Sequence, residues 1–112
     1  MPKHSNDRLQ GTLDLLVLRI LANAPAPLHG YGIAQKIHAL TRDGLRIEEG
    51  SLYPALHRMA NEKWLRAQWG VTEINRRARF YSITVAGRRQ LDEEQQRWAQ
   101  LTQAVDRVLQ LA

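Results

Sequence analysis

The chain has 112 residues without a cysteine, and 16 Lys and Arg against 11 Asp and Glu give it a formal net charge of +5. This length allows one domain, and the lack of cysteine excludes disulfides and a thiol nucleophile. No apolar run approaches the roughly 20 residues of a membrane span, and residues 1–9 lack the apolar core of a signal peptide. We therefore expect a cytoplasmic protein with no membrane partner, whose positive charge favours either a polyanionic partner or simply solubility.

The first predicted helix covers residues 9–24 and is apolar on nearly every side, with Asp14 and Arg19 as interruptions. Residues 1–8 before it are polar and are predicted to form an arm. A helix that is apolar all round has to be covered all round, either as an ordinary core helix or partly by a second copy of the chain. The residues of this helix that we assign to a dimer contact are Leu13, Leu16 and Ile20.

The second predicted helix begins at about residue 28 or 30, after Pro25 and Pro27 have ended the first. Its apolar residues at positions 33, 37 and 40 recur at helical spacing. The HGYG sequence at its start is not a nucleotide-binding loop, because no strand precedes it and no Lys-Ser/Thr pair follows. Tyr31, near this start, can face outward.

The stretch from Glu48 to Trp64 is predicted to be a short helix with two different faces. Leu52, Leu56 and Met59 recur at helical spacing and form one apolar stripe. The opposite face carries hydroxyl, aromatic, imidazole and guanidinium groups, which can bond to phosphates and to base edges. The residues of this face that we assign to nucleic-acid contact are Ser51, Tyr53, Pro54, His57 and Arg58.

Pro54 fits this helix if the helix begins near Gly50 or Ser51, because the first four N–H groups of a helix have no intrahelical partner. With a turn at Asp43 and Gly44 between them, the two short helices make a helix-turn-helix candidate. Taken alone, a helix with a mixed polar face is more typical of an ordinary surface helix. The interpretation therefore depends on the segments that follow.

Residues 65–71 alternate and are predicted to form a half-buried strand, residues 72–75 a turn and residues 76–84 the returning strand. The apolar face of the first strand consists of Leu65, Ala67, Trp69 and Val71. The basic residues at or near the hairpin tip are Arg76, Arg77 and Arg79. A hairpin directly after a recognition helix is a wing, and its arginines can hold phosphates or enter a minor groove; in isolation such a tip is a solvated turn.

The remainder, from Thr84 to about Leu111, is predicted to be one long helix with Thr84 as its N-cap. Apolar residues recur along it at heptad spacing and form a seam suited to a second helix. The seam residues that we assign to a dimer interface are Leu91, Trp98, Leu101, Val105 and Val108. A gap beside Trp98 would let a small aromatic effector stack on the indole; otherwise a heptad Trp is plain interface core.

No pattern in the chain indicates catalysis, a metal site or a cofactor. Ser51 lacks the G-x-S-x-G setting of a nucleophile, and the four histidines show no metal-ligand spacing with carboxylates. The acidic residues at 92–94 are adjacent on a helix and so point in different directions. His57 is either a DNA-facing residue or a plain surface histidine.

Four segments together carry a recognisable pattern: LDLLVLRIL at residues 13–21, HGYGIAQKI at 29–37, EGSLYPALHRM at 49–59 and RFYSITVAGRRQL at 79–91. This pattern resembles the PadR-type family of winged-helix transcriptional repressors. The resemblance implies a winged helix-turn-helix whose N-terminal and long C-terminal helices pair across a dimer. It also implies that the operator is contacted by the basic wing together with Tyr31, Ser51, Tyr53 and Pro54.

Lys63 departs from the family pattern, because many relatives have glycine at this place before an aromatic or aliphatic residue. A left-handed cap here would cost a non-glycine residue about 1 kcal/mol. The end of the recognition helix is therefore the part of the fold that the resemblance leaves open.

We therefore predict a mainly α protein with a small β-hairpin (α+β), in which residues 1–83 form a winged helix-turn-helix domain and residues 84–112 a C-terminal dimerisation helix. The predicted function is sequence-specific binding of double-stranded operator DNA by a homodimeric regulator, a repressor acting on an inverted repeat. The alternative is a winged-helix module that binds a protein or RNA partner. Binding that is salt-dependent and selective for a duplex sequence would separate the two.

Overall fold

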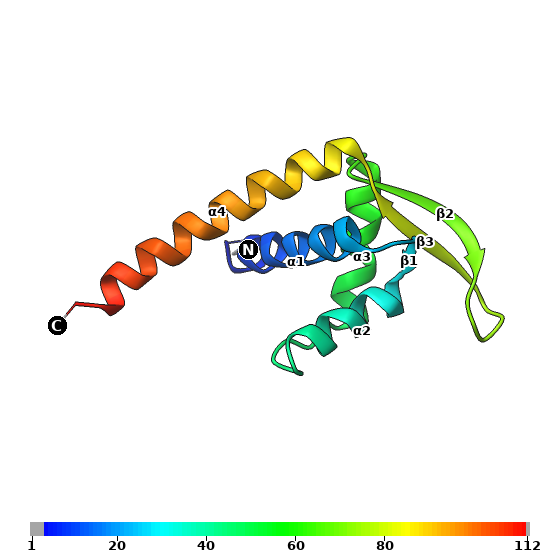
Figure 1. The fold of residues 1–112 in the computed structure, drawn as a ribbon, viewed down its shortest axis with the longest axis horizontal. Coiled ribbons are helices and arrows are strands. Elements are labelled where there is room, and N and C mark those ends of the chain that lie inside the picture. The colour runs from blue at the N-terminus through cyan, green and yellow to red at the C-terminus, as the bar shows by residue number, and fades with distance from the viewer. Residues whose placement is uncertain (1–3, 112) are drawn as a thin grey trace.

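The computed structural model describes the backbone of residues 4–111 and the side chains of residues 11–111. In this part the chain forms four helices and a three-stranded antiparallel sheet (Figure 1). In chain order these elements are α1 (His4–Asn23), β1 (Leu28–His29), α2 (Gly30–Leu40), α3 (Glu49–Asn61), β2 (Leu65–Val71), β3 (Arg77–Ile83) and α4 (Val85–Leu109). The predicted α+β class and the long C-terminal helix are confirmed. No helix in these described residues is long and apolar enough to cross a membrane.

Two elements differ from the prediction. α1 already begins at His4, so residues 4–8 are helical and not an arm, while residues 1–3 lie outside the described residues. No proline or glycine stops the helix there, but the polar sequence carries no apolar period that would reveal it. The short strand β1 was not predicted, because two residues are too few for a pattern. It pairs with β3 and makes β3 the central strand of the order β1-β3-β2.

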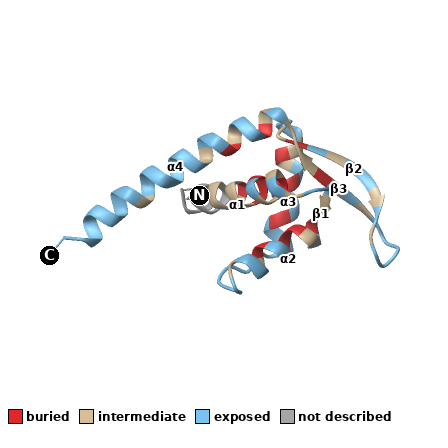
Figure 2. Cartoon of the chain, in the orientation of Figure 1, coloured by how far each residue is buried: buried red, intermediate tan, exposed pale blue. Residues whose placement is uncertain are grey.

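The core lies where α1, α2 and α3 meet the base of the sheet (Figure 2). The predicted stripe of α3 is buried there, as are Ile33 and Ile37 of α2, whereas Leu40 at the end of α2 is 73% exposed. In Figure 1 the hairpin of β2 and β3 extends from one side of this core and α4 from the other. The hairpin tip and the outer half of α4 are therefore both free of the core.

α3 ends at Asn61 and is followed by a left-handed turn at Lys63, which the sequence left open. The Lys63 N–H donates to the Ala60 carbonyl and the Trp64 N–H to the Met59 carbonyl, both at 3.0 Å. This pair of bonds is a Schellman cap, and it places Lys63 at a φ of 69°. Lysine therefore occupies a turn position whose positive φ favours glycine.

α4 starts against the same turn. The Thr84 N–H donates to the Trp64 carbonyl at 3.0 Å, and Thr84 Oγ1 accepts from the Gly87 N–H at 3.0 Å as the helix N-cap. A Cβ on Gly87 would lie 2.2 Å from the Trp64 oxygen, so a larger residue does not fit. These contacts set the direction of α4 relative to α3.

A partly buried ion pair joins α1 to α3. Asp14 is 4% exposed, and its Oδ1 accepts from Arg58 Nη2 at 2.6 Å. Burial raises the pKa of Asp14, and the hydrogen bond and charge of Arg58 oppose that rise. The guanidinium thus points toward α1. Arg58 was predicted to contact nucleic acid from the outer side of α3, but its guanidinium is paired with Asp14, and helical spacing could not show that a carboxylate lies beside it.

We expect Lys63→Gly to raise the free energy of unfolding by about 1 kcal/mol, because glycine adopts a positive φ without a Cβ clash. The urea midpoint measures this change. Lys63→Ala is the matched control, since it removes the same side chain and keeps the Cβ. An equal gain in both variants would contradict the backbone explanation.

We expect Arg58→Ala to lower the free energy of unfolding by about 3 kcal/mol at neutral pH, because the Asp14 carboxylate would stay buried without its partner. Arg97 forms an ion pair with Glu94 on the surface of α4, so Arg97→Ala is the control and should cost less than about 1 kcal/mol. Chemical denaturation of both variants measures the difference.

The cost of Arg58→Ala should also depend on pH. Burial raises the pKa of Asp14, and loss of the guanidinium raises it further. A folded-state pKa above the unfolded value means that the folded protein gains stability as the pH falls through the folded pKa. The loss of stability caused by Arg58→Ala is therefore greatest above the folded-state pKa of Asp14 in the variant. It becomes smaller as the pH falls from that pKa toward the unfolded-state pKa. A cost that stays constant on acidification would contradict the assignment.

Candidate nucleic-acid interface

The outer face of α3 presents four of the five predicted contact residues. Ser51, Tyr53, Pro54 and His57 are exposed, while the apolar stripe on the other side of the helix is covered by the core. The face is mostly uncharged and offers hydroxyl and imidazole groups, which can exchange hydrogen bonds with base edges.

Pro54 lies deeper in the helix than expected. α3 begins at Glu49, so Pro54 is its sixth residue and not part of the first turn. The ring lacks the N–H that would bond to the Gly50 carbonyl four residues earlier. Gly50 is exposed, which leaves this carbonyl to solvent. The helix therefore tolerates the proline for a different reason from the one predicted.

Tyr53 packs α3 against the start of α2. A Cβ on Gly30 would lie 2.5 Å from Cε1 of Tyr53, so the ring occupies the space that glycine leaves free. Burial, followed by the charge of Glu49, raises the pKa of the phenol, which stays protonated and able to donate. Tyr31 lies at the same end of α2, and its hydroxyl accepts from Gln35 Nε2 at 3.1 Å. Both hydroxyls thus belong to one edge of the helix-turn-helix.

The connection between α2 and α3 is held by side chains of α2 and its cap. His38 Nε2 accepts from the Ile47 N–H at 2.9 Å. Thr41 Oγ1 accepts from the Leu45 N–H at 3.1 Å and donates to the Ile37 carbonyl at 2.7 Å. These bonds satisfy the backbone of the extended link and fix where α3 begins.

The wing is a regular hairpin closed by a tight turn. β2 and β3 pair in register from Leu65 opposite Ile83 to Val71 opposite Arg77. In the turn the Thr72 N–H donates to the Arg76 carbonyl at 2.8 Å, and Asn75 has a φ of 63°. The exposed basic residues of the turn and of β3 are Arg76, Arg77 and Arg79. Among residues 11–111, no carboxylate forms an ion pair with any of the three.

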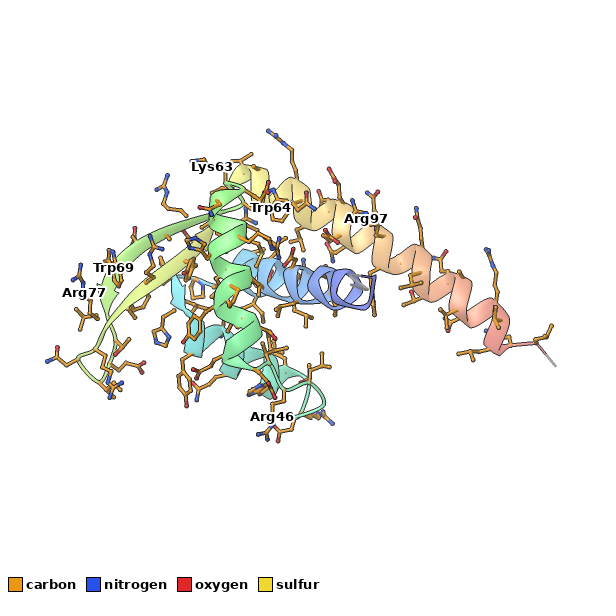
Figure 3. The ribbon with its side chains drawn as sticks, turned by 180° about the vertical axis from the view of Figure 1, so that it is seen from behind. Arg46, Lys63, Trp64, Trp69, Arg77 and Arg97 are labelled. Atoms are coloured by element: carbon orange, nitrogen blue, oxygen red, sulfur yellow. The ribbon has the colours of Figure 1, made fainter. Side chains whose placement is uncertain are left out.

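Trp69 is the wing residue that sequence reasoning missed. The alternation assigned it to the buried face of β2, yet it is 58% exposed, because the hairpin continues past the end of the core. Arg77 Cζ lies 4.5 Å and Arg79 Cζ 5.5 Å from the centroid of its ring. Figure 3 labels Trp69 and Arg77 side by side on the hairpin. The signal was present in the register, since the turn at residues 72–76 places Arg79 opposite Trp69.

A groove of about 390 Å³ separates the C-terminal half of α3 from the wing. Its basic and imidazole side chains are His57, Lys63, Arg66 and Arg79. Lys63 and Arg66 were not predicted as contacts, because only the fold brings the end of α3 beside the strands. A groove lined in this way suits a polyanion better than a neutral or cationic partner.

The residues predicted for a dimer interface separate into three groups. Trp98, Leu101, Val105 and Val108 form a stripe on the outer part of α4 and are 45–70% exposed. On α1 the three predicted residues, Leu13, Leu16 and Ile20, are half-buried against the core. Leu91 is buried in the core of its own subunit, so its assignment to the interface is wrong. The heptad spacing runs through all the predicted seam residues of α4, but the first of them, Leu91, packs inside its own subunit.

A second groove, of about 490 Å³, runs between α1 and α4. Trp64 and Trp98 are among its walls, and the buried Asp14–Arg58 pair lies in it. Glu94, also in the groove, accepts from Gln90 Nε2 at 2.9 Å. The groove therefore combines aromatic surface with carboxylates that already have partners.

Residues 17–93 match the transcriptional regulator PadR-like family. The chain is 35% identical over 78 residues to the transcriptional regulator Rv3488 of Mycobacterium tuberculosis, which covers 70% of this chain and 69% of that protein. It is 36% identical over 91 residues to an uncharacterized 37.1 kDa protein in transposon TN4556 of Streptomyces fradiae, covering 81% of this chain but only 25% of that protein. The structure of a PadR-like transcriptional regulator from Bacillus cereus superposes with a TM-score of 0.74 at 28% identity, over 95% of this chain and 99% of that one. The chain belongs to the PadR-like family of transcriptional regulators.

Proposed function

We propose that this chain binds double-stranded operator DNA as a homodimer and represses transcription from an inverted repeat. The observation that carries the proposal is the basic groove between α3 and the wing, with an exposed hydroxyl and imidazole face beside it. A DNA strand held in such a groove meets positive charge from both walls. The neighbouring face of α3 can then lie in the major groove.

The two parts of this surface have different roles in the proposal. Base contacts come from the exposed face of α3, led by Ser51, Tyr53 and His57, with Pro54 and Tyr31 at its edge. Phosphate contacts come from Arg76, Arg77 and Arg79, which are exposed and have no ion-pair partner among residues 11–111. Arg58 is left out of both roles, because its guanidinium forms an ion pair with Asp14 of α1.

Dimerisation through α4 supplies the second half of the site. The 25 residues of α4 extend about 37 Å at 1.5 Å each, and the apolar stripe on its outer part is exposed in one subunit. A second copy covers this stripe most simply, together with the half-buried apolar residues of α1. Two recognition helices held in this way can meet half-sites about 34 Å apart.

The groove between α1 and α4 is the proposed place for a small aromatic effector. Trp98 is 47% exposed and lines it, so a planar ring can stack on the indole. Trp64 lies in the same groove at the end of α3, which connects such a ligand to the recognition helix.

We expect binding to duplex DNA to weaken steeply with salt, with a log–log slope of about 0.9 for each of roughly six to ten phosphate contacts in a dimer. Arg76→Ala with Arg77→Ala should lower this slope and weaken all sequences alike, whereas Ser51→Ala or His57→Ala should also change the preferred sequence. Fluorescence anisotropy in a salt series and selection from a random duplex pool measure these effects.

An affinity independent of salt would rule out the proposed DNA contact and favour the alternative of a protein partner. Preference for single-stranded RNA over duplex DNA would favour the other alternative. If the wing variant changed the preferred sequence and the helix variants did not, the assigned roles would be reversed.

We expect Leu101→Glu with Val105→Glu to give a folded monomer that has lost most of its DNA affinity. Both residues are exposed in one subunit, so the charges disrupt the seam without entering the core. Gln96→Glu with Gln103→Glu adds the same charge on the opposite side of α4 and is the control. Sedimentation velocity measures the oligomeric state. A charged-seam variant that remains a dimer would place the interface elsewhere.

A further inference from the structure

We propose that Trp69 is a positioning residue of the wing, which holds Arg77 and Arg79 ready to bind phosphates of one DNA strand. The inference rests on the proposed DNA binding and adds to it a residue that itself carries no charge. The three side chains form a cluster on one face of the hairpin, which we call the arginine–tryptophan cluster.

The register of the hairpin produces this cluster. Arg79 is the cross-strand partner of Trp69. Arg77 precedes Arg79 by two residues in β3, nearer the turn, and lies on the same face. Both guanidiniums lie within the distance at which a cation is attracted to an aromatic ring. This face of the sheet is also the one that carries Leu65 and Tyr81 into the core, so the cluster is its continuation beyond the core.

Stacking on an indole holds an arginine without neutralising it. A carboxylate partner would occupy the N–H donors and cancel the charge, whereas a ring contacts the flat face of the guanidinium and leaves the in-plane N–H groups free. No carboxylate of residues 11–111 pairs with Arg77 or Arg79. The indole therefore restricts the motion of both side chains, which lowers the entropy lost when they bind a phosphate.

The opposite face of the hairpin keeps this platform in place. A Cβ on Gly70 would lie 2.7 Å from Cδ1 of Phe80, so the Phe80 ring lies against the bare backbone beside Trp69. His29 meets the Phe80 ring edge-on, with 5.2 Å between the ring centroids. Side chains thus pack along the opposite face of the hairpin as far as Gly70, the residue next to Trp69. This packing stabilises the part of β2 that carries Trp69.

The alternative role for an exposed aromatic residue on a wing is insertion between bases. The cluster argues against it, because the two guanidiniums already lie over the indole that would have to enter the base stack. The two roles differ in one measurable way. A positioning residue acts only through Arg77 and Arg79, whereas an inserted residue acts without them.

The experiment measures the affinity of the full chain for a fluorescein-labelled duplex of mixed sequence at several salt concentrations. The variants are Trp69→Ala, Trp69→Leu and Trp69→Phe, each also made in a background of Arg77→Ala with Arg79→Ala. Ile74→Ala is the matched control, since it removes an exposed apolar side chain from the hairpin turn, away from the cluster. Thermal unfolding of each variant checks the fold, and Trp69→Leu keeps the apolar bulk if the alanine variant is less stable.

We expect Trp69→Ala and Trp69→Leu to weaken binding about five- to tenfold, and Trp69→Phe, which keeps a ring, to stay within about twofold of the wild type. In the background without Arg77 and Arg79, all three substitutions should have no further effect. Equal losses in both backgrounds would show that the indole contacts DNA itself and would overturn the proposal. So would Trp69→Leu binding as tightly as the wild type. Failure of the wild type to bind any duplex would instead overturn the proposed function.

Discussion

The carbonyl of Trp64 is the point at which α3, the wing and α4 are fixed to one another. It accepts from the Thr84 N–H, and Gly87 lies against it too closely to carry a side chain. The left-handed turn at Lys63 is needed to aim this carbonyl, since it reverses the chain from α3 into β2. The direction of α4, and with it the separation of the two α3 helices in the proposed dimer, therefore depends on a few backbone atoms.

The arginines of this structure differ in whether a carboxylate neutralises them. Between α1 and α3, Arg58 pairs with Asp14, whose burial makes a partner necessary. On the wing, Arg77 and Arg79 are stacked on an indole and keep their charge. The same residue type thus stabilises the fold in one place and remains available for an anion in the other. Its position in a helical or strand pattern does not distinguish these uses.

Much of the fold follows from the sequence because its signals are local. The stripe of Leu52, Leu56 and Met59 and the strand at residues 65–71 were predicted from spacing, and the cap at Thr84 from its residue type. The structure has all three. The extent of the core is not a local property. Trp69 and Leu91 fit their periodic patterns equally well, yet the first extends beyond the core and the second lies inside it.

The candidate site was predictable only as a set of exposed residue types, because its geometry comes from contacts between distant segments. Asp14 and Arg58 are 44 residues apart, and neither shows in the sequence that it will meet the other. Their contact joins α1 to α3 inside the groove that Trp64 and Trp98 also line. Anything that shifts α1 against α4 in this groove acts on the buried pair and on the end of α3 together. The proposed dimer contact and the proposed DNA contact are thus connected through packed side chains, which is the physical condition for one to affect the other.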